Sequence, residues 1–286
     1  MLKKLLKYDM QWVWKIWWIL IPSVLGVGFF DALLLRFVIV QFSSEEPTMP
    51  VLAVLALFAL IFSIFILVGS TMLTFALVHI RFYTHLFTDQ GYLTFTLPVK
   101  RRDILLSKAI NALFWTAMHA VLLVIVVLFF VTFAPPPEDA GLLSLFLYDR
   151  FAELLSLLWT QFGGFLILYA VLALVLLALL ECFSISLCFF CITLASTVVK
   201  KAKLLLAVGI YYGATSVISF FSSIFGTFGS VIFGEGLAEL LTGKVSAMQH
   251  LSITVLLILA CVIVAAIASV FYFITRNILE RKLNLA

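Results

Sequence analysis

The chain has 286 residues, of which 65% are hydrophobic and only 11% are charged, with a net charge of +4. A soluble domain carries about 25% charged residues, so this chain lacks the polar surface of a soluble protein. Its apolar residues come in solid runs of the ~20 residues that cross a bilayer core, which favours helices over the alternating strands of a β-barrel. The composition therefore predicts an all-α, polytopic membrane protein.

Residues 1–15 are predicted to form an amphipathic helix on the membrane surface. On a helical wheel one face collects the polar residues Lys3, Lys4, Lys7, Gln11 and Lys15. The opposite face collects Leu2, Leu5, Leu6, Trp12, Val13 and Ile16. Lysines of such a helix face anionic headgroups, and tryptophans lie at the boundary. Asp9 departs from the pattern because it falls on the apolar face.

Six membrane spans are expected, at about 16–40, 51–78, 109–133, 162–190, 204–232 and 250–274. The fourth apolar run, from Gln161 to Val199, is long enough for two spans. Two spans would place the basic residues of 200–203 outside the cell, so one long helix that projects into the cytoplasm is predicted instead. The second run, from Pro50 to about Ile80, is predicted to project likewise.

The basic residues predict that both termini are cytoplasmic. Of the 18 Lys and Arg residues, only Arg36, Arg150 and Lys244 fall on one side of the six spans, which leaves 18 − 3 = 15 on the other. Cytoplasmic segments are the ones enriched in Lys and Arg. Because these residues mark the ends of spans, the positive charge does not indicate nucleic-acid binding. The two loops at 41–50 and 134–141 are acidic, contain proline and are predicted to lie outside.

The fifth apolar region is rich in serine and glycine, with glycines at 213, 226, 229, 234 and 236. Glycine permits both close helix packing and a break in the helix. We expect the helix to end near Phe225 and the chain to re-enter the outer leaflet within 226–248.

Ionisable and polar groups inside spans are costly and mark pathways or helix pairs. The candidates are Glu181, Asp31, Arg36, Asn111, His119, Tyr211 and Tyr212. The sequence leaves open whether each lines a pathway, links helices or marks the interface. The four cysteines, Cys182, Cys188, Cys191 and Cys261, lie in apolar runs without metal-ligand neighbours, and packing residues are expected there.

The stretch "GYLTFTLPVKRRDILLSK", residues 91–108, separates the second and third spans. Its first half places Leu93 and Leu97 four residues apart and Tyr92 and Phe95 three apart, the spacing of apolar anchors on a helix that lies in a groove. Pro98 cannot continue such a helix. The alternative is that the stretch is a linker whose basic residues only mark the cytoplasmic boundary.

This stretch resembles the second inner loop of ABC-2-type transporter permeases. The matching positions are Gly91, Leu93, Thr96, Pro98, Val99, Arg101, Ile104, Leu105, Leu106, Ser107 and Lys108. The resemblance extends to the plan of an amphipathic N-terminal helix, six spans, cytoplasmic termini and a broken outer segment between spans five and six. Lys100 departs from it, since the family often has a capping Ser or Thr there.

The resemblance implies a permease subunit of the bacterial plasma membrane that pairs with a second permease, as a homodimer or a related heterodimer, on two ATP-binding subunits. Within the cytoplasmic coupling loop 79–108, a short helix at about Asp89–Leu97 would dock onto an ATPase. The residues implied in docking are Asp89, Gly91, Tyr92, Leu93, Phe95, Leu97, Pro98, Arg101 and Arg102. The cargo would be a hydrophobic or amphipathic peptide, lipid or drug, moved outward.

The chain contains no G-x-x-x-x-G-K-[ST] phosphate-binding loop. ATP and Mg²⁺ are therefore expected on a partner chain, and this subunit is expected to be no enzyme and to need no cofactor of its own. Two other classes compete. An ion-coupled carrier or channel would show inverted repeats and a charge network at the midplane. An intramembrane enzyme would show paired catalytic groups, which the histidines His79, His85, His119 and His250 do not form with carboxylates in sequence.

Overall fold

The computed structural model describes residues 2–43, 49–96, 98–133, 156, 158–160, 162–199, 201–242 and 247–281. Within these ranges the chain is helical and contains no strand, which confirms the all-α prediction. Six of the described helices are long and apolar enough to cross a membrane. The chain therefore has the make-up of a multi-pass membrane protein.

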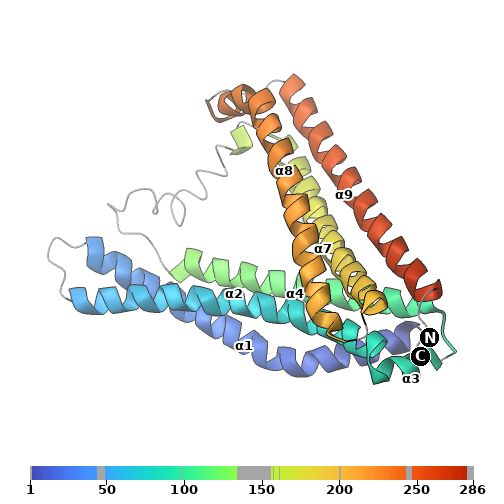
Figure 1. Ribbon diagram of the computed structural model, residues 1–286. Helices are drawn as coiled ribbons and strands as arrows, with labels where there is room; N and C mark the ends of the chain where they lie inside the picture. The colour runs from blue at the N-terminus through green and yellow to red at the C-terminus, as the bar shows by residue number, and fades with distance from the viewer. Residues whose placement is uncertain are drawn as a thin grey trace. The chain divides into compact units, whose positions relative to one another are not determined.

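The helices are shown in chain order in Figure 1. They are α1 (Leu2–Ser43), α2 (Pro50–Phe87), α3 (Asp89–Thr96), α4 (Arg101–Phe133), α7 (Phe165–Val198), α8 (Lys203–Thr242) and α9 (Ala247–Arg281). All but α3 contain an apolar stretch of spanning length, and each of these stretches overlaps one predicted span. Between Phe165 and Val198 the fourth apolar run is one continuous helix, α7.

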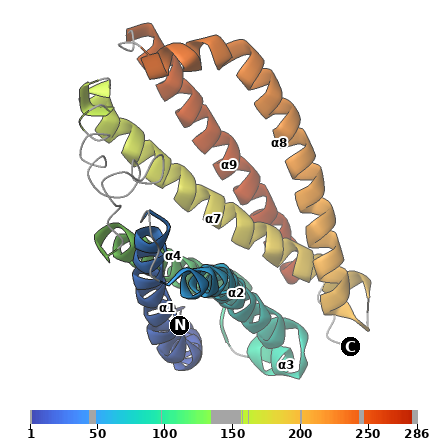
Figure 2. The same cartoon turned by 90° about the vertical axis from the view of Figure 1, so that its left-hand side faces the viewer.

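One expectation is wrong, since α8 does not end near Phe225 but continues to Thr242. Its apolar, membrane-length stretch does stop at Ile224. Figure 2 shows the later part of α8 bending over toward the start of α9. Glycine lowers helix stability by only ~1 kcal/mol, whereas opening backbone hydrogen bonds in an apolar medium costs several. The glycines therefore permit a bend without ending the helix.

The helix α1 is unbroken from the N-terminal segment into the first span. Its lysines Lys3, Lys4, Lys7 and Lys15 are exposed, while Val13 and Trp17 on the other face are fully buried. Asp9 is also buried, on the apolar face where the sequence put it. An amphipathic helix on the membrane surface over 1–15 stays a prediction.

The exposed side chains of the long helices are largely apolar. On α2, Phe58, Phe62 and Phe65 are between 64% and 69% exposed and lie on one face at helical spacing. Soluble proteins rarely expose apolar stripes of this length. Such a face suits contact with lipid.

The chain divides into two compact units. The first, here the α7–α9 unit, comprises Met1–Leu2, His79–Ala109 and Leu158–Ala286. In it α7 packs against both α8 and α9, and the rings of Phe190 and Phe271 lie 5.2 Å apart. The helix α3 and the ends of α2 and α4 next to it also belong to this unit.

The second, here the α1–α2–α4 unit, comprises Lys3–Val78 and Ile110–Leu157. The indole rings of Trp17 on α1 and Trp115 on α4 lie 4.9 Å apart. Further along the same two helices, Gly28 faces Val126 without room for a side chain. Bulky rings at one point and a glycine at another let α1 follow α4 closely.

Candidate functional site

The candidate site is the short helix α3 with the turns on either side of it. After α2 ends at Phe87, Thr88 begins a tight reversal in which the Gly91 amide donates to the Thr88 carbonyl at 2.7 Å. Asp89 stands in the first turn of α3, where a negative charge favours the helix N-terminus. The helix then runs for eight residues, to Thr96.

Gly91 is required by this reversal. A Cβ atom at this position would lie 2.6 Å from the Leu86 carbonyl oxygen and 2.9 Å from its carbon. Both are backbone atoms of α2 and cannot rotate away. The glycine that the family resemblance picks out therefore has a physical reason, which is the close approach of α3 to the end of α2.

The structure thus has a short helix at Asp89–Thr96, where one was predicted at about Asp89–Leu97. It ends two residues before Pro98, which is exposed in the following bend. The Lys100 carbonyl accepts the Asp103 amide at 2.9 Å, and α4 begins at Arg101. Lys100 thus stands immediately before the first residue of α4. The docking role of α3 stays a prediction.

The predicted docking residues differ in what surrounds them. Asp89, Pro98 and Arg102 are exposed, Phe95 and Arg101 are half-buried, and Gly91 is buried. Leu97 lies outside the described residues, and so do the side chains of Tyr92 and Leu93 on α3. The exposed part of the segment carries charge and proline, as a surface that meets a partner or headgroups would.

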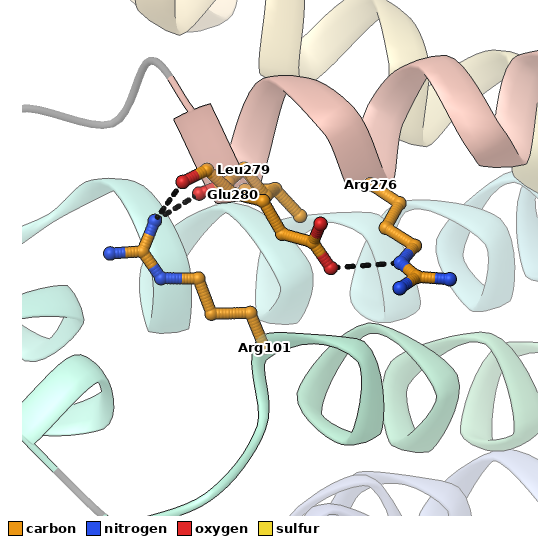
Figure 3. A network of polar contacts seen from close by, with 4 residues as sticks. All are labelled: Arg101, Arg276, Leu279 and Glu280. Atoms are coloured by element: carbon orange, nitrogen blue, oxygen red, sulfur yellow. Dashed lines mark hydrogen bonds and ion pairs between the residues drawn. The ribbon is translucent and has the colours of Figure 1, made fainter.

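Arg101 makes contacts within the chain that the sequence did not suggest. Its Nη1 atom donates to the backbone carbonyls of Leu279 and, at 3.1 Å, of Glu280, near the C-terminal end of α9 (Figure 3). Its guanidinium carbon lies 5.3 Å from the centroid of the Phe95 ring on α3. Of the two arginines predicted to grip a partner, Arg101 is held by α9 and α3, and Arg102 is exposed.

Other contacts tie the α3 segment to α7 and α8, and sequence reasoning missed them. Phe82 near the end of α2 stacks on Phe189 of α7, with ring centroids 3.8 Å apart and planes 8° from parallel. Lys203, the first residue of α8, donates to the carbonyl of Phe87, the last residue of α2, at 3.4 Å. The only sequence signal was a concentration of aromatic residues at 82–95 and 183–190.

Within the segment, the end of α2 is tied to the start of α4. Lys108, a position of the resemblance, is buried and its Nζ atom donates to His85 Nδ1 at 3.0 Å. The buried ammonium group of Lys108, two turns into α4, thus has a hydrogen-bond acceptor on α2. This bond closes the loop formed by the end of α2, α3 and the start of α4.

The candidate pathway residues of the α1–α2–α4 unit are Asp31, Arg36, Asn111 and His119. Asp31 is buried and its Oδ2 atom has no hydrogen-bond partner among the described residues, while Arg36 is exposed, so the two do not share a site. His119 bridges α4 to α2, with Nε2 3.0 Å from Thr71 Oγ1 and Nδ1 3.4 Å from Thr74 Oγ1.

Asn111 bonds within its own helix instead, where its Oδ1 atom accepts from Trp115 Nε1 at 3.1 Å. His119 therefore links α4 to α2, and Asn111 orients the indole ring of Trp115. Neither arrangement forms a cluster of charged groups.

The remaining candidates, Glu181, Tyr211 and Tyr212, lie in the α7–α9 unit. Glu181 on α7 is exposed, as is Tyr212 on α8. Tyr211 is half-buried and hydrogen-bonds Ser184 of α7. The structure thus links α7 to α8 through Tyr211.

The cysteines Cys188 and Cys191 are buried on α7, and Cys182 and Cys261 are half-buried. Among the residues that the structure describes, no group of three His, Cys, Asp or Glu side chains could hold a metal ion.

In comparisons with known proteins, no family model, no curated protein and no solved structure matches this chain.

Proposed function

We propose that the chain is the membrane-spanning permease subunit of an ATP-driven ABC transporter in a bacterial plasma membrane. The observation that carries the proposal is α3, a helix of eight residues set between two membrane-length helices. A linker between spans needs no helix of its own, whereas a partner that grips the chain needs a short rigid element. The distribution of Lys and Arg predicts that this element lies in the cytoplasm, where ATP is available.

In the proposed transporter, ATP is hydrolysed by other chains. The sequence lacks a phosphate-binding loop, so ATP and Mg²⁺ bind to partner ATPase subunits. Two permease subunits, identical or related, sit on two ATPases, and the cavity between the permeases alternates its access. Its cargo is a hydrophobic or amphipathic peptide, lipid or drug, and its direction is outward, as in the family that the segment 91–108 resembles.

The mechanism requires that α3 grips the ATPase through apolar side chains. Tyr92 and Leu93 are the anchors that the spacing selects, and a carboxylate at both positions would be desolvated against an apolar groove. The double variant Tyr92→Asp, Leu93→Asp is expected to lose the co-purified ATPase, or to keep it while ATP hydrolysis no longer depends on substrate. Affinity purification followed by an ATPase assay measures both.

The matched control is Lys201→Asp, which adds a carboxylate to an exposed residue in the other predicted cytoplasmic turn, between α7 and α8. This variant is expected to keep its ATPase. Unchanged ATPase binding and coupling in the Tyr92, Leu93 double variant would remove α3 as the docking site.

A second candidate function, an ion-coupled carrier, is favoured by the buried carboxyl group of Asp31 on α1. Buried ionisable groups in spans often carry protons or ions. A carrier of this kind would lose transport when a protonophore collapses the ion gradient and would keep it when ATP is depleted. The ABC proposal expects the opposite result in both conditions.

A further inference from the structure

The guanidinium of Arg101 caps the end of a helix that is far away in the sequence. The last four carbonyls of an α-helix have no partner within the helix. In α9, which ends at Arg281, two of these carbonyls belong to Leu279 and Glu280, and both accept from Arg101 Nη1 (Figure 3). Arg101 thus satisfies two backbone groups that would otherwise need water.

The electrostatics of this contact favour a cation. A helix C-terminus carries a partial negative charge, and a guanidinium placed there is attracted to it. The Glu280 carboxylate does not compete for Arg101, because it pairs with Arg276 Nε at 2.8 Å. Leu279 is buried, so the contact lies at the edge of a packed region and is partly protected from solvent screening.

The same side chain also reaches α3. The guanidinium of Arg101 lies 5.3 Å from the Phe95 ring centroid, within the range of a cation–π contact. Arg101 is itself the first residue of α4. One side chain therefore joins the short helix, the start of α4 and the end of α9.

The opposite side of the segment is joined in a similar way. Lys203 donates to the last carbonyl of α2, and Phe82 stacks on Phe189 of α7. Both ends of the segment that carries α3 are thus fixed to α7, α8 and α9 rather than only to α2 and α4. The membership of His79–Ala109 in the α7–α9 unit agrees with these contacts.

We propose that Arg101 is a positioning residue that fixes α3 to the C-terminal end of α9, so that a displacement of α3 moves α9 as well as α2 and α4. The role of Arg101 in transport rests on the proposed function, whereas its contact with α9 does not depend on that function. A displacement of α3 is then transmitted to the whole α7–α9 unit, of which α3 is a part. Arg101 in this account does not touch the ATPase.

The first test measures the contact alone. Hydrogen–deuterium exchange of the full chain in detergent reports on the last turn of α9. Arg101→Ala is expected to raise the exchange rate there about tenfold, since charged hydrogen bonds to the terminal carbonyls are lost. Arg101→Lys is expected to give an intermediate rate, because an ammonium keeps the charge but lacks the planar face that stacks on Phe95.

The matched control is Arg102→Ala, which removes the same charge one residue later from an exposed side chain. In this variant the backbone amides in the last turn of α9 are expected to exchange at the wild-type rate. Equal exchange rates in Arg101→Ala and Arg102→Ala would overturn the inference, as would wild-type exchange in both variants of Arg101.

The second test measures the consequence in the complex with its ATPase. Arg101→Ala is expected to keep the ATPase bound while substrate-stimulated ATP hydrolysis falls at least about fivefold, the lower end of usual coupling between sites. Loss of the ATPase from Arg101→Ala would make Arg101 a docking contact and overturn the inference. If the wild-type chain binds no ATPase, the proposed function fails, and the exchange rates still decide whether Arg101 fixes α9.

Discussion

Gly91 illustrates how one residue sets the position of the candidate site. It lies where α3 turns back on the end of α2, and a Cβ there would meet backbone atoms of Leu86 at 2.6 and 2.9 Å. We predict that Gly91→Ala lowers the free energy of unfolding by about 1–3 kcal/mol, the usual cost of forcing extra volume into a packed site. Thermal unfolding in detergent and amide exchange in α3 measure this.

The control for that prediction is Gly209→Ala on α8, where an added Cβ meets nothing within 4 Å. Alanine is favoured over glycine in a helix by ~1 kcal/mol, so this variant should be as stable as the wild type or slightly more stable. Equal melting temperatures for the two variants would contradict the close approach of α3 to α2.

At the scale of single residues, the sequence identified the type of some groups but not their partners. Gly91 acts by leaving room for the backbone of α2, and Pro98 acts because it has no backbone N–H group to donate. Both effects are local, so the sequence motif was enough to predict them. Arg101 bonds to residues 178 and 179 positions away, and no local pattern encodes a contact of that range. His119 was assigned only to helix pairing or a pathway, and Thr71 and Thr74 became visible as its partners only in three dimensions.

At the scale of helices, the approach of α1 to α4 depends on a glycine. A Cβ on Gly28 would lie 2.6 and 2.7 Å from the two methyl carbons of Val126. Valine is stiff at χ1 and cannot move both methyl groups aside. We predict that Gly28→Ala lowers the free energy of unfolding by about 1–3 kcal/mol. Unfolding of the detergent-solubilised chain, followed by circular dichroism, measures the loss.

Two variants make this prediction specific. Gly26→Ala lies on the same helix two residues earlier, where nothing stands within 4 Å, and it should leave the stability unchanged or raise it slightly. Adding Val126→Ala to Gly28→Ala should recover most of the loss, because it removes both clashing methyl groups. A Gly28→Ala chain that is as stable as Gly26→Ala would rule out the close packing of α1 on α4.

The helices themselves follow from the sequence to different degrees. Long apolar runs determine the six membrane-length helices, and the reversal at Gly91 with the stop at Pro98 determines α3. The end of α8 was misplaced because glycine allows a break without requiring one. The sequence also could not show that α3 belongs with α7–α9, since that depends on Phe82 meeting Phe189 and Lys203 meeting Phe87.

At the scale of the whole molecule, three features bear on the proposed function. Six membrane-length helices give a multi-pass chain, the basic residues predict its orientation, and α3 is a short helix on the predicted cytoplasmic side. The chain carries no phosphate-binding loop, so a machine driven by ATP needs another subunit. The central claim is therefore that this chain works as a complex with an ATPase.

Purification of the tagged wild-type chain from the membranes of its native cells tests this claim most directly. Mass spectrometry of the purified material, combined with an ATP hydrolysis assay and a transport assay in vesicles, identifies any bound subunit and its contribution. The account predicts a co-purified ATPase that has a phosphate-binding loop, together with transport that stops when ATP is removed. A chain that purifies alone and still transports its substrate without ATP would contradict it.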